Sequence, residues 1–425
     1  MCKKNYNFAA QMRLIYFFIW LAGVFGHRKA KLLYRGQREA LQKLKAEYSG
    51  RLQGTHPIWI HVASVGEFEQ ARPIIEHLRS QRPDAHILLT FYSPSGYELR
   101  KNYAQVDYVS YLPIPTYANA RQLLDTVEPS MAIFVKYEFW PAYLKNLRKR
   151  HIPTYSISAI FRRGQLFFLP WGGHHRQLLH CFTRIYVQDE ASKSLLERFG
   201  IKDVRIAGDT RFDRVSQVAA QAKELPVVEN FVSPRTSLDG LPAPHRVIIA
   251  GSTWPEDEEL LARYVDTHPD VLLVLVPHEI HEAHLRRIFH IFHGRYVRFS
   301  EADRHNVLHV RTLLIDTIGM LSSIYRYGDV AYIGGGFGAG IHNTLEAAVY
   351  GMPVLFGPKY THFREAIGLI DAGAAYSITD YATFEARMDE ALANHENIGK
   401  KAGEFVRQGV GATDYIYKEL FKHNK

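Results

Sequence analysis

The chain has 425 residues, of which 47% are hydrophobic and 22% charged, and its formal net charge is +9. This composition excludes a disordered chain and allows two domains, each with its own core. The excess of Lys and Arg indicates an anionic partner, which could be nucleic acid, an acidic membrane surface or a phosphorylated substrate. Cys2 and Cys181 are the only cysteines, which argues against a disulfide framework and fits a reducing compartment.

Residues 14–25, with the sequence LIYFFIWLAGVF, contain no charge and follow Arg13. As a helix they would span roughly 18 Å, well short of the roughly 30 Å core of a bilayer. No small-x-small cleavage site precedes the basic cluster that begins at His27, which disfavours a signal peptide. We expect residues 1–50 to form a monotopic membrane anchor followed by a basic helix that contacts acidic head groups. A packed N-terminal helix with a solvated basic face is the alternative.

From residue 58 onward, apolar runs alternate with helical patterns, which predicts parallel sheets covered on both faces. A proline-rich stretch at 225–245 breaks this rhythm and is interpreted as a linker. We therefore expect two doubly wound α/β domains, at 51–224 and 246–425, with a cleft between them. The predicted strands are 58–62, 87–91, 108–112, 131–135, 154–158, 185–187 and 204–207 in the first domain, and 247–250, 271–276, 313–315, 330–333 and 354–356 in the second.

In the first half, polar residues follow the strands at the positions where open α/β sheets bind ligands. Ser64, Gly66 and Glu67 come directly after the first strand. Glu67, at a helix start beside a glycine that admits a substrate, suits a general base, although complementing the helix dipole is the alternative. Glu138 follows the fourth strand, and Arg211 follows the last one, where a cation can face an anionic leaving group.

In the second half, a glycine-rich loop at 334–340 joins a strand to a helix that opens near Asn343. Such a turn suits a phosphate or a ribose, and Gly335 and Gly336 are candidate contacts. Glu346 could hold a ribose diol or cap its own helix. The acidic residue of the dinucleotide fingerprint and a Gly-Lys-Ser/Thr are both missing. A packing turn is therefore an equal alternative.

Gly251 and Ser252 also follow a strand, and their backbone could meet a phosphate. The acidic run at 256–259 is interpreted as a solvated helix start. The chain has no Asp-x-Asp that could hold a divalent metal for a nucleotide diphosphate. Three histidines fall one residue short of the zinc-protease spacing, so they are interpreted as surface and cleft residues: His278, His281 and His284.

Together these residues resemble the Kdo transferase family, which moves 3-deoxy-D-manno-octulosonic acid (Kdo) from CMP-Kdo onto the lipid A precursor. The resemblance runs from the N-terminal anchor to the final helices. It rests on several motifs in order, namely His61-x-Ala63-Ser64-x-Gly66-Glu67, Glu138-x-Trp140-Pro141, Gly208-x-x-Arg211-Phe212-Asp213, Ala250-Gly251-Ser252-Thr253, Asp316-Thr317-x-Gly319, and Gly334-Gly335 with His342-Asn343-x-Leu345-Glu346.

The resemblance implies the GT-B fold, in which an N-terminal Rossmann-like domain binds the acceptor and a C-terminal one binds the donor across a cleft. It implies that Glu67 is the general base, that Glu138 and Arg211 assist the transition state, and that the anomeric centre is inverted without a metal or other cofactor. The implied location is the cytoplasmic face of the inner membrane, with CMP-Kdo, the lipid A precursor and the acidic membrane surface as partners and no nucleic acid. The implied CMP contacts are Pro277, His278, Gly319, Met320, Leu321, Asn343, Thr344, Leu345 and Glu346.

Two positions depart from the family pattern. Many relatives carry Arg where this chain has His278, which puts one fixed phosphate contact in question, and many carry Lys where Arg211 stands, which keeps the charge but changes its geometry. Two other functions remain open. One is a different GT-B enzyme that uses a UDP-sugar, as a transferase or an epimerase, and the other is a basic module that binds membranes or nucleic acid.

Overall fold

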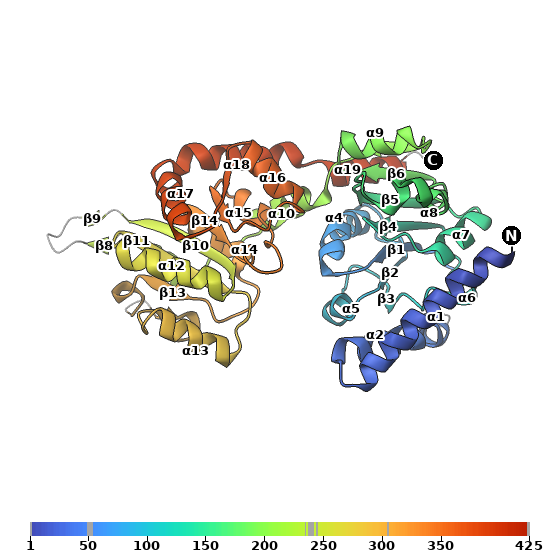
Figure 1. Cartoon of the computed structure of the whole chain (residues 1–425), viewed down its shortest axis with the longest axis horizontal. Coiled ribbons are helices and arrows are strands. Elements are labelled where there is room, and N and C mark those ends of the chain that lie inside the picture. Colours follow the sequence, from blue (N-terminus) through green and yellow to red (C-terminus); the bar gives the residue numbers. More distant parts are fainter. Residues whose placement is uncertain are drawn as a thin grey trace. The chain divides into compact units, whose positions relative to one another are not determined.

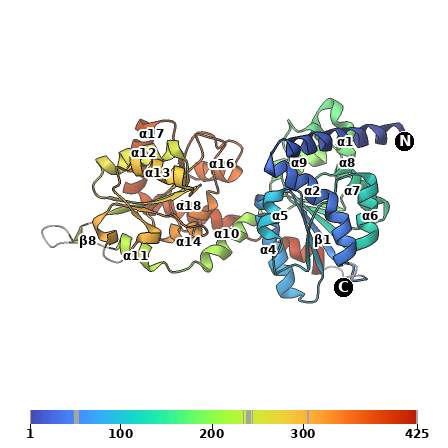
Figure 2. The same ribbon diagram turned by 90° about the horizontal axis from the view of Figure 1, so that it is seen from below.

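The computed structural model describes residues 2–48, 54–233, 235–236, 242–243, 245–303 and 306–422. The chain divides into two compact units (Figure 1). Unit 1 comprises residues 1–214 together with 410–425, and unit 2 comprises residues 215–409. Each unit is a twisted parallel sheet with helices on both faces, seen from a second direction in Figure 2. The predicted two-domain α/β fold is confirmed.

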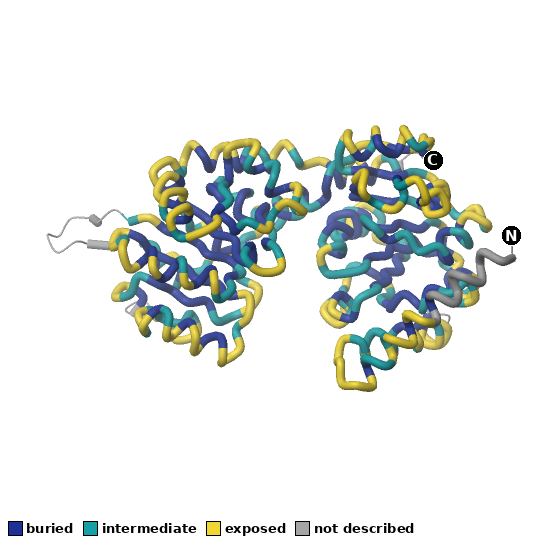
Figure 3. Tube along the Cα trace, viewed as in Figure 1, coloured by how far each residue is buried: buried dark blue, intermediate teal, exposed yellow. Residues whose placement is uncertain are grey.

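The sheet of unit 1 has seven parallel strands in the order β3-β2-β1-β4-β5-β6-β7. Most of their residues are buried (Figure 3), as expected for a parallel sheet covered on both faces. The central strand β1 pairs with both β2 and β4, so the strand order reverses there and the carboxyl ends of β1 and β4 form a switch point. The strands are β1 (Ile58–Val62), β2 (Ile87–Phe91), β3 (Tyr108–Tyr111), β4 (Met131–Val135), β5 (Thr154–Ala159), β6 (Arg184–Val187) and β7 (Val204–Ile206).

The helices of unit 1 carry the connections between these strands, and two more precede the sheet. Apolar side chains of α4 and of the C-terminal helix share one core with the sheet, including Ile74 and Ile416. The helices are α1 (Cys2–Val24), α2 (Arg28–Lys43), α4 (Val65–Gln81), α5 (Pro94–Arg100), α6 (Tyr117–Val127), α7 (Pro141–Lys149), α8 (Gly173–Leu179), α9 (Glu190–Arg198), α10 (Thr210–Ala220) and α19 (Ala412–Tyr417), with π-helical turns at Leu44–Tyr48 and Lys418–Lys422.

The C-terminal segment belongs to unit 1, which differs from the domain boundary at residue 425 that the sequence suggested. Ile416, Tyr417 and Phe421 bury their side chains against the first sheet and α4. Asp213 also accepts hydrogen bonds from the backbone N–H groups of Gly411 and Thr413, at 2.7 and 3.0 Å. The partners of this segment lie about 200 or more positions earlier in the chain, so local sequence pattern does not identify them.

Unit 2 repeats the architecture, with strands in the order β12-β13-β11-β10-β14-β15-β16, all parallel. Here β10 lies between β11 and β14, and the carboxyl ends of β10 and β14 form the equivalent switch point. The strands are β10 (Arg246–Thr253), β11 (Val271–Pro277), β12 (Val297–Arg298), β13 (Thr312–Leu314), β14 (Val330–Ile333), β15 (Val354–Phe356) and β16 (Ala375–Ser377). The helices are α11 (Pro226–Val232), α12 (Pro255–Thr267), α13 (Glu282–Ile291), α14 (Leu321–Ile324), α15 (Leu345–Ala348), α16 (Arg364–Asp371), α17 (Tyr381–Ala393) and α18 (His395–Gly409).

The predicted linker at 225–245 contains regular structure. Pro226 is the first residue of α11, where the fixed φ of proline fits a helix and its missing N–H is not needed. A two-stranded antiparallel pair follows, formed by β8 (Arg235–Thr236) and β9 (Pro242–Ala243). Pro234 and Pro244 lie outside the described residues.

The N-terminal helix α1 packs on α2 through the side chains of Met12 and Tyr16, both of which are buried. Its other face leaves large apolar side chains in solvent, with Phe18 57% and Val24 61% exposed. Across the part of the chain that the structure describes, no helix combines the length and apolarity needed to cross a bilayer.

Candidate active site

Glu67 lies at the switch point of unit 1, in the first turn of α4 just beyond β1. Ser64 caps this helix, and its Oγ accepts a hydrogen bond from the Glu67 backbone N–H at 3.5 Å. The side chain turns back toward β1, where Glu67 Oε2 accepts a hydrogen bond of 2.5 Å from the Ala63 backbone N–H. The carboxylate is therefore held at the carboxyl end of the strand.

The environment of Glu67 makes its carboxyl group a weak acid. Burial raises the pKa of Glu67 to about 7, and the negative charge of Glu138 acts in the same direction. The Ala63 hydrogen bond and the charge of Lys136 oppose this rise only in part. A carboxyl group with a pKa near neutrality can both accept and release a proton at physiological pH, as a general base must.

Glu138 follows β4 and is only 8% exposed. Its Oε2 accepts hydrogen bonds from Trp140 Nε1 at 2.6 Å and from His61 Nε2 at 3.0 Å. His61 is itself fully buried, and its Nδ1 lies 2.9 Å from Thr90 Oγ1, which also accepts from Trp59 Nε1 at 2.8 Å. With Nε2 protonated and Thr90 donating to Nδ1, both ring nitrogens of His61 and the indole N–H groups of Trp59 and Trp140 have partners.

Gly66 precedes Glu67 and is surrounded by open space. Among the described residues, the heavy atom nearest to a Cβ built on Gly66 is Ser64 Oγ, at 4.0 Å. The space that the missing side chain leaves is thus not filled by the neighbouring described residues. That this glycine admits a substrate stays a prediction.

Arg211 is already paired within unit 1. Its Nε and one terminal nitrogen donate to Asp209 Oδ2 at 2.9 and 2.7 Å, and its backbone N–H donates to Asp209 Oδ1 at 3.0 Å. Burial opposes the ionisation of Asp209, but the Arg211 charge and hydrogen bonds hold the pKa of that carboxyl below its usual value. Asp209 therefore orients the guanidinium that the sequence assigns to the leaving group.

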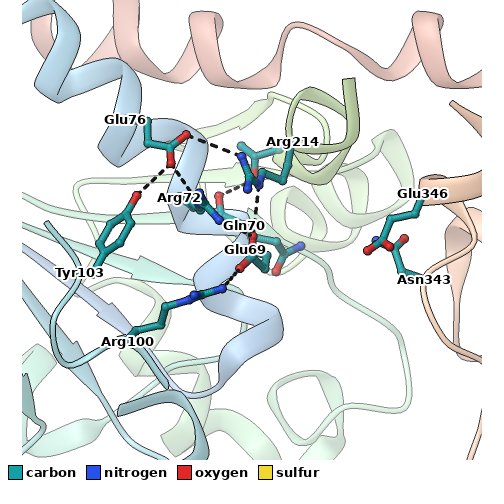
Figure 4. Close-up of polar contacts among 10 residues, drawn as sticks. Glu69, Gln70, Arg72, Glu76, Arg100, Tyr103, Arg214, Asn343 and Glu346 are labelled. Atoms are coloured by element: carbon teal, nitrogen blue, oxygen red, sulfur yellow. Dashed lines mark hydrogen bonds and ion pairs between the residues drawn. The ribbon is translucent and has the colours of Figure 1, made fainter. Parts of the chain in front are cut away.

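A network of ion pairs on α4, α5 and α10 was not predicted from the sequence (Figure 4). Glu69 accepts hydrogen bonds from Arg100 at 3.0 Å and from Arg214 at 3.2 Å. Glu76 pairs with Arg72 at 2.7 Å and lies 3.7 Å from Arg214. Glu69, Arg100 and Arg214 come from three segments more than 20 residues apart, so their pairing has no local signal in the sequence. Arg72 and Glu76 are an i,i+4 pair within α4.

The glycine-rich loop of unit 2 is packed against its own chain. A Cβ on Gly334 would lie 2.3 Å from Ser252 O, and one on Gly336 would lie 2.5 Å from Gly357 Cα. Gly335 has φ +90° and donates its N–H to Asp257 Oδ2 at 2.9 Å. Backbone of unit 2 thus occupies the space beside Gly334 and Gly336 and leaves no clearance for a ligand there, which favours the alternative of a packing turn. Gly335 and Gly336 as ligand contacts stay predictions.

Close packing also explains the glycine at position 251, since a Cβ there would lie 2.1 Å from Tyr325 Oη. Its neighbour Ser252 has φ +54°, and β10 has an irregular register at this point. Left-handed backbone in a non-glycine residue is a local strain that persists where the surroundings fix it. Lys136 and Ser158 show the same conformation, at +62° beyond β4 and +50° near the end of β5.

The acidic start of α12 was predicted to be solvated, and this is correct for the exposed Glu256 and Glu259 but wrong for Asp257 and Glu258, which are buried. Asp257 is 1% and Glu258 0% exposed. Besides Gly335, Asp257 accepts hydrogen bonds from Tyr332 Oη at 2.7 Å and Trp254 N at 2.9 Å. Glu258 accepts from Thr253 Oγ1 and pairs with His284, at 2.9 Å, so His284 is a core residue and not a surface one.

His278, directly after β11, is the middle ring of a stack of three. Its ring centroid lies 4.8 Å from that of Trp254 and 4.4 Å from that of His342. Burial and the neighbouring His278 lower the pKa of His342 to about 4, so the ring is neutral at pH 7. This agrees with the hydrogen bond of 3.4 Å that His342 Nε2 accepts from Trp254 Nε1. The carboxyl ends of β10, β11 and β14 thus present a flat aromatic group.

The remaining predicted donor contacts lie in the same unit, at the end of β11 and in or just before the short helices α14 and α15. Asn343 Nδ2 donates to Glu346 Oε1 at 2.9 Å, and Asn343 Oδ1 accepts from Leu345 N at 3.1 Å (Figure 4). Thr344 is fully buried. Gly319 has φ +90° and precedes Met320, the N-cap of α14, and Leu321, its first residue; Pro277 is the last residue of β11. These assignments stay predictions.

No group of three or more His, Cys, Asp or Glu side chains in the described residues could hold a metal ion. The prediction that the reaction needs no metal is a separate matter, and stays a prediction.

Comparison with known families and proteins shows which family this chain is similar to. The model of the family described as 3-deoxy-D-manno-octulosonic-acid transferase (kdotransferase) matches residues 34–214. A 3-deoxy-D-manno-octulosonic acid transferase of Rickettsia felis is 26% identical over 376 residues, covering 84% of this chain and 75% of the relative. That of Aquifex aeolicus is 26% identical and covers 80% of this chain and 87% of the relative. The chain is thus similar to the Kdo transferase family over most of its length, which agrees with the sequence resemblance. These similarities support a glycosyltransferase that acts on Kdo.

Solved structures that are similar to this chain share its fold at low sequence identity. A UDP-GlcNAc 2-epimerase from Neisseria meningitidis aligns with a TM-score of 0.62 and 16% identity, covering 86% of this chain and all of the other. MurG of Acinetobacter baumannii aligns with a TM-score of 0.54 and 12% identity, covering 86% and 99%. With the two parallel sheets, these similarities confirm the GT-B fold.

Several residues that contact the predicted site residues were not predicted from the sequence. Asp209 orients Arg211, and Trp254 and His342 stack with His278. Thr90 completes the buried series at His61. A polar residue inside an otherwise apolar strand, as at Thr90, is the one signal that could have pointed to such a network.

Proposed function

We propose that the protein transfers Kdo from CMP-Kdo to a hydroxyl group of a lipid A precursor in lipopolysaccharide assembly, with Glu67 as the general base. In this reaction the Glu67 carboxylate takes the proton of the acceptor hydroxyl. The acceptor oxygen then forms the new bond to the anomeric carbon of Kdo from the opposite side, while the bond from that carbon to the CMP phosphate oxygen breaks and CMP leaves. The anomeric centre is inverted.

The observation that carries this proposal is the Glu67 carboxyl group, with its pKa of about 7, at the switch point of unit 1 beside Glu138. A group that only complemented the helix dipole would be expected to have a lowered pKa, because the dipole favours the ionised form. Here burial and a second negative charge raise it instead. Glu138 has the further role of stabilising positive charge that develops on the sugar in the transition state.

Donor binding is assigned to unit 2. The Asn343–Glu346 pair can hold the ribose diol, because its carboxylate accepts hydrogen bonds and its amide both donates and accepts. The stack of Trp254, His278 and His342 offers a flat face and ring nitrogens beside the strand ends. We assign no resident metal or cofactor to the reaction. Arg211, oriented by Asp209, is assigned to the departing phosphate.

The N-terminal helices support a location on an acidic membrane surface, at the cytoplasmic face of the inner membrane. The exposed apolar face of α1 can enter the head-group region, and α2 follows with exposed cations. This arrangement fits a monotopic association. The apolar residues of this face are Leu14, Ile15, Phe17, Phe18, Trp20, Val24 and Phe25, and the cations are Arg28, Lys29, Lys31, Arg35 and Arg38.

The experiment combines purified protein with CMP-Kdo and a lipid A precursor, and measures CMP release and the mass of the lipid product. Wild type should release CMP and add Kdo to the lipid, and Glu67→Ala should do neither. Absence of product with wild type, or full activity of the variant, would contradict the proposal. Stabilisation by UDP in preference to CMP would instead indicate an enzyme that uses a UDP-sugar.

A further inference from the structure

An apolar pocket of about 420 Å³ opens between α1, α2 and the segment that joins β3 to α6. Its walls are formed largely by Met12, Tyr16, Phe17, Trp20, Tyr34 and Ile114. The volume lies in the range of small-molecule sites and suits one extended chain. The predicted functions of this region, a membrane anchor or a packed helix, do not account for a pocket.

The polar residues at the pocket bind one another. Thr116 Oγ1 accepts a hydrogen bond from Asn119 N at 3.2 Å, and Asn119 Nδ2 donates to Ile114 O at 2.9 Å. Tyr16 Oη donates to Gln37 Oε1. These internal bonds leave a lining that is chiefly aromatic and aliphatic, which favours an apolar occupant over a polar one.

A series of side-chain contacts links Tyr16, in the wall of the pocket, to Glu138 in the candidate active site. Gln37, which holds Tyr16, donates through Nε2 to Tyr92 O at 3.3 Å. The ring of Tyr92 stacks on Trp140, with centroids 4.8 Å apart, and Trp140 donates to Glu138. Ile114 lies beyond the carboxyl end of β3, in the same parallel sheet whose β1 and β4 ends carry Glu67 and Glu138. Pocket and base therefore belong to one edge of the sheet of unit 1.

The outer mouth of the pocket lies on the surface assigned to the membrane. Phe17 and Trp20 line the pocket and are also 51% and 42% exposed. Lys29 and Lys31 follow on the next helix, where they can meet the phosphate groups of an anionic lipid. An acyl chain that enters the pocket at this mouth would place its head group along the edge of the unit 1 sheet that carries Glu67.

We propose that this pocket binds one acyl chain of the acceptor glycolipid and so places the acceptor hydroxyl at Glu67. The inference rests on the proposed transfer reaction and adds to it the part of the acceptor that is recognised. Each methylene group removed from water should strengthen binding by about fourfold, so a chain shortened by a few carbons should bind markedly less well.

The first test uses acceptors that share one phosphorylated sugar but differ in acyl length, each kept below its critical micelle concentration so that the chain passes from water into the pocket. For wild type, kcat/KM should rise about tenfold or more from the shortest to the longest chain, chiefly through KM. Ile114→Trp fills the pocket and should reduce this ratio to about twofold. Ile206→Trp, a matched change at an exposed residue of β7 outside the pocket, should retain it. A ratio that is flat in wild type, or unchanged in Ile114→Trp, would overturn the proposal.

A second test does not depend on turnover or on the folding of Ile114→Trp. An acceptor with brominated acyl chains should quench the fluorescence of Trp20, and the quenching should fall in Trp20→Phe. Equal quenching in both proteins would overturn the proposal, as would quenching by brominated phospholipid that added acceptor does not relieve, since the occupant would then be bulk lipid. Quenching of Trp20 without any Kdo transfer would refute the proposed function and leave the acyl-chain site standing.

Discussion

Two turns of this molecule join a strand to a helix through glycine, and they use the glycine in opposite ways. At Gly66, after β1, an added Cβ would meet its nearest described neighbour only at 4.0 Å. At Gly336, after β14, it would lie 2.5 Å from Gly357 Cα. The first turn leaves space beside a carboxyl group with a pKa of about 7, and the second packs its space with backbone. A glycine in a sequence marks where space is needed, but only the structure shows what fills it.

The largest expected effect comes from Glu67, in the open turn. Glu67→Gln should lower kcat by about 10²- to 10⁴-fold, because the amide cannot take the acceptor proton. It should also stabilise the protein above pH 7. The raised pKa means that the wild-type contribution to stability is complete below pH 4.5 and is lost as the pH rises through about 7.

The neutral amide avoids this loss and can still accept the Ala63 hydrogen bond, so the gain should be about 2 kcal/mol at pH 8 and absent at pH 4. Urea unfolding at both pH values, with kcat from CMP release, measures the two effects. Glu98→Gln is the control, since Glu98 is exposed on α5 and forms a surface ion pair of little energetic weight with Lys101. A Glu67→Gln protein that is equally active, or less stable at pH 8, would contradict the account.

In the packed turn, Gly336→Ala should destabilise unit 2. Its Cβ would meet backbone atoms of Gly357 that cannot rotate away, and such overpacking costs about 1 to 3 kcal/mol. Thermal unfolding should show a lowered Tm. Gly338→Ala serves as the control, because its Cβ would lie at an ordinary 3.7 Å from Gly335 O. If Gly336→Ala kept its Tm and lost only donor binding, ligand clearance would be the correct explanation after all.

In the open turn, Gly66→Ala should stabilise the protein but lower its activity, the reverse of what we expect for Gly336→Ala. The fold tolerates the methyl group, and alanine in a helix should stabilise by about 0.5 to 1 kcal/mol. The kcat/KM for the acceptor should nevertheless fall about tenfold to a hundredfold, since a displacement of roughly 1 Å is enough for such a loss. Gly173→Ala, at another helical glycine of unit 1 whose added Cβ would meet no described atom within 4 Å beyond its own helix and chain neighbours, should be stabilised to a similar extent but keep the wild-type kcat/KM. Unchanged kinetics of Gly66→Ala would mean that no substrate uses this space.

The smallest expected effect concerns the support of Glu138. Trp140→Phe keeps a ring to stack on Tyr92 but removes the 2.6 Å hydrogen bond to Glu138. Losing one donor to a buried carboxylate should cost about 1 to 3 kcal/mol of stability. We expect kcat to fall about three- to tenfold, because Glu138 keeps its bond to His61. A loss as large as that of Glu67→Gln would show that the base acts through Trp140.

Much of the fold and of the candidate site could be predicted from the sequence. The rest depends on contacts between residues that are far apart in the sequence. The apolar runs gave most strands of both sheets, but β12 and β16, of two and three residues, are too short to show a pattern. The positions of Glu67 and Glu138 after β1 and β4 follow from local order alone. Burial of Asp257 does not, because its partners Tyr332 and Gly335 come from β14 and the loop beyond it.

The measurement that tests the central claim most directly is the pH dependence of kcat/KM for Kdo transfer from CMP-Kdo. With Glu67 as the base, the wild-type value should rise about tenfold per pH unit below neutrality and level off above an apparent pKa of about 7. In Glu67→Gln, the small residual rate should show no such inflection. A wild-type profile that is flat from pH 5 to 8, or an inflection that Glu67→Gln retains, would contradict the assignment of the base.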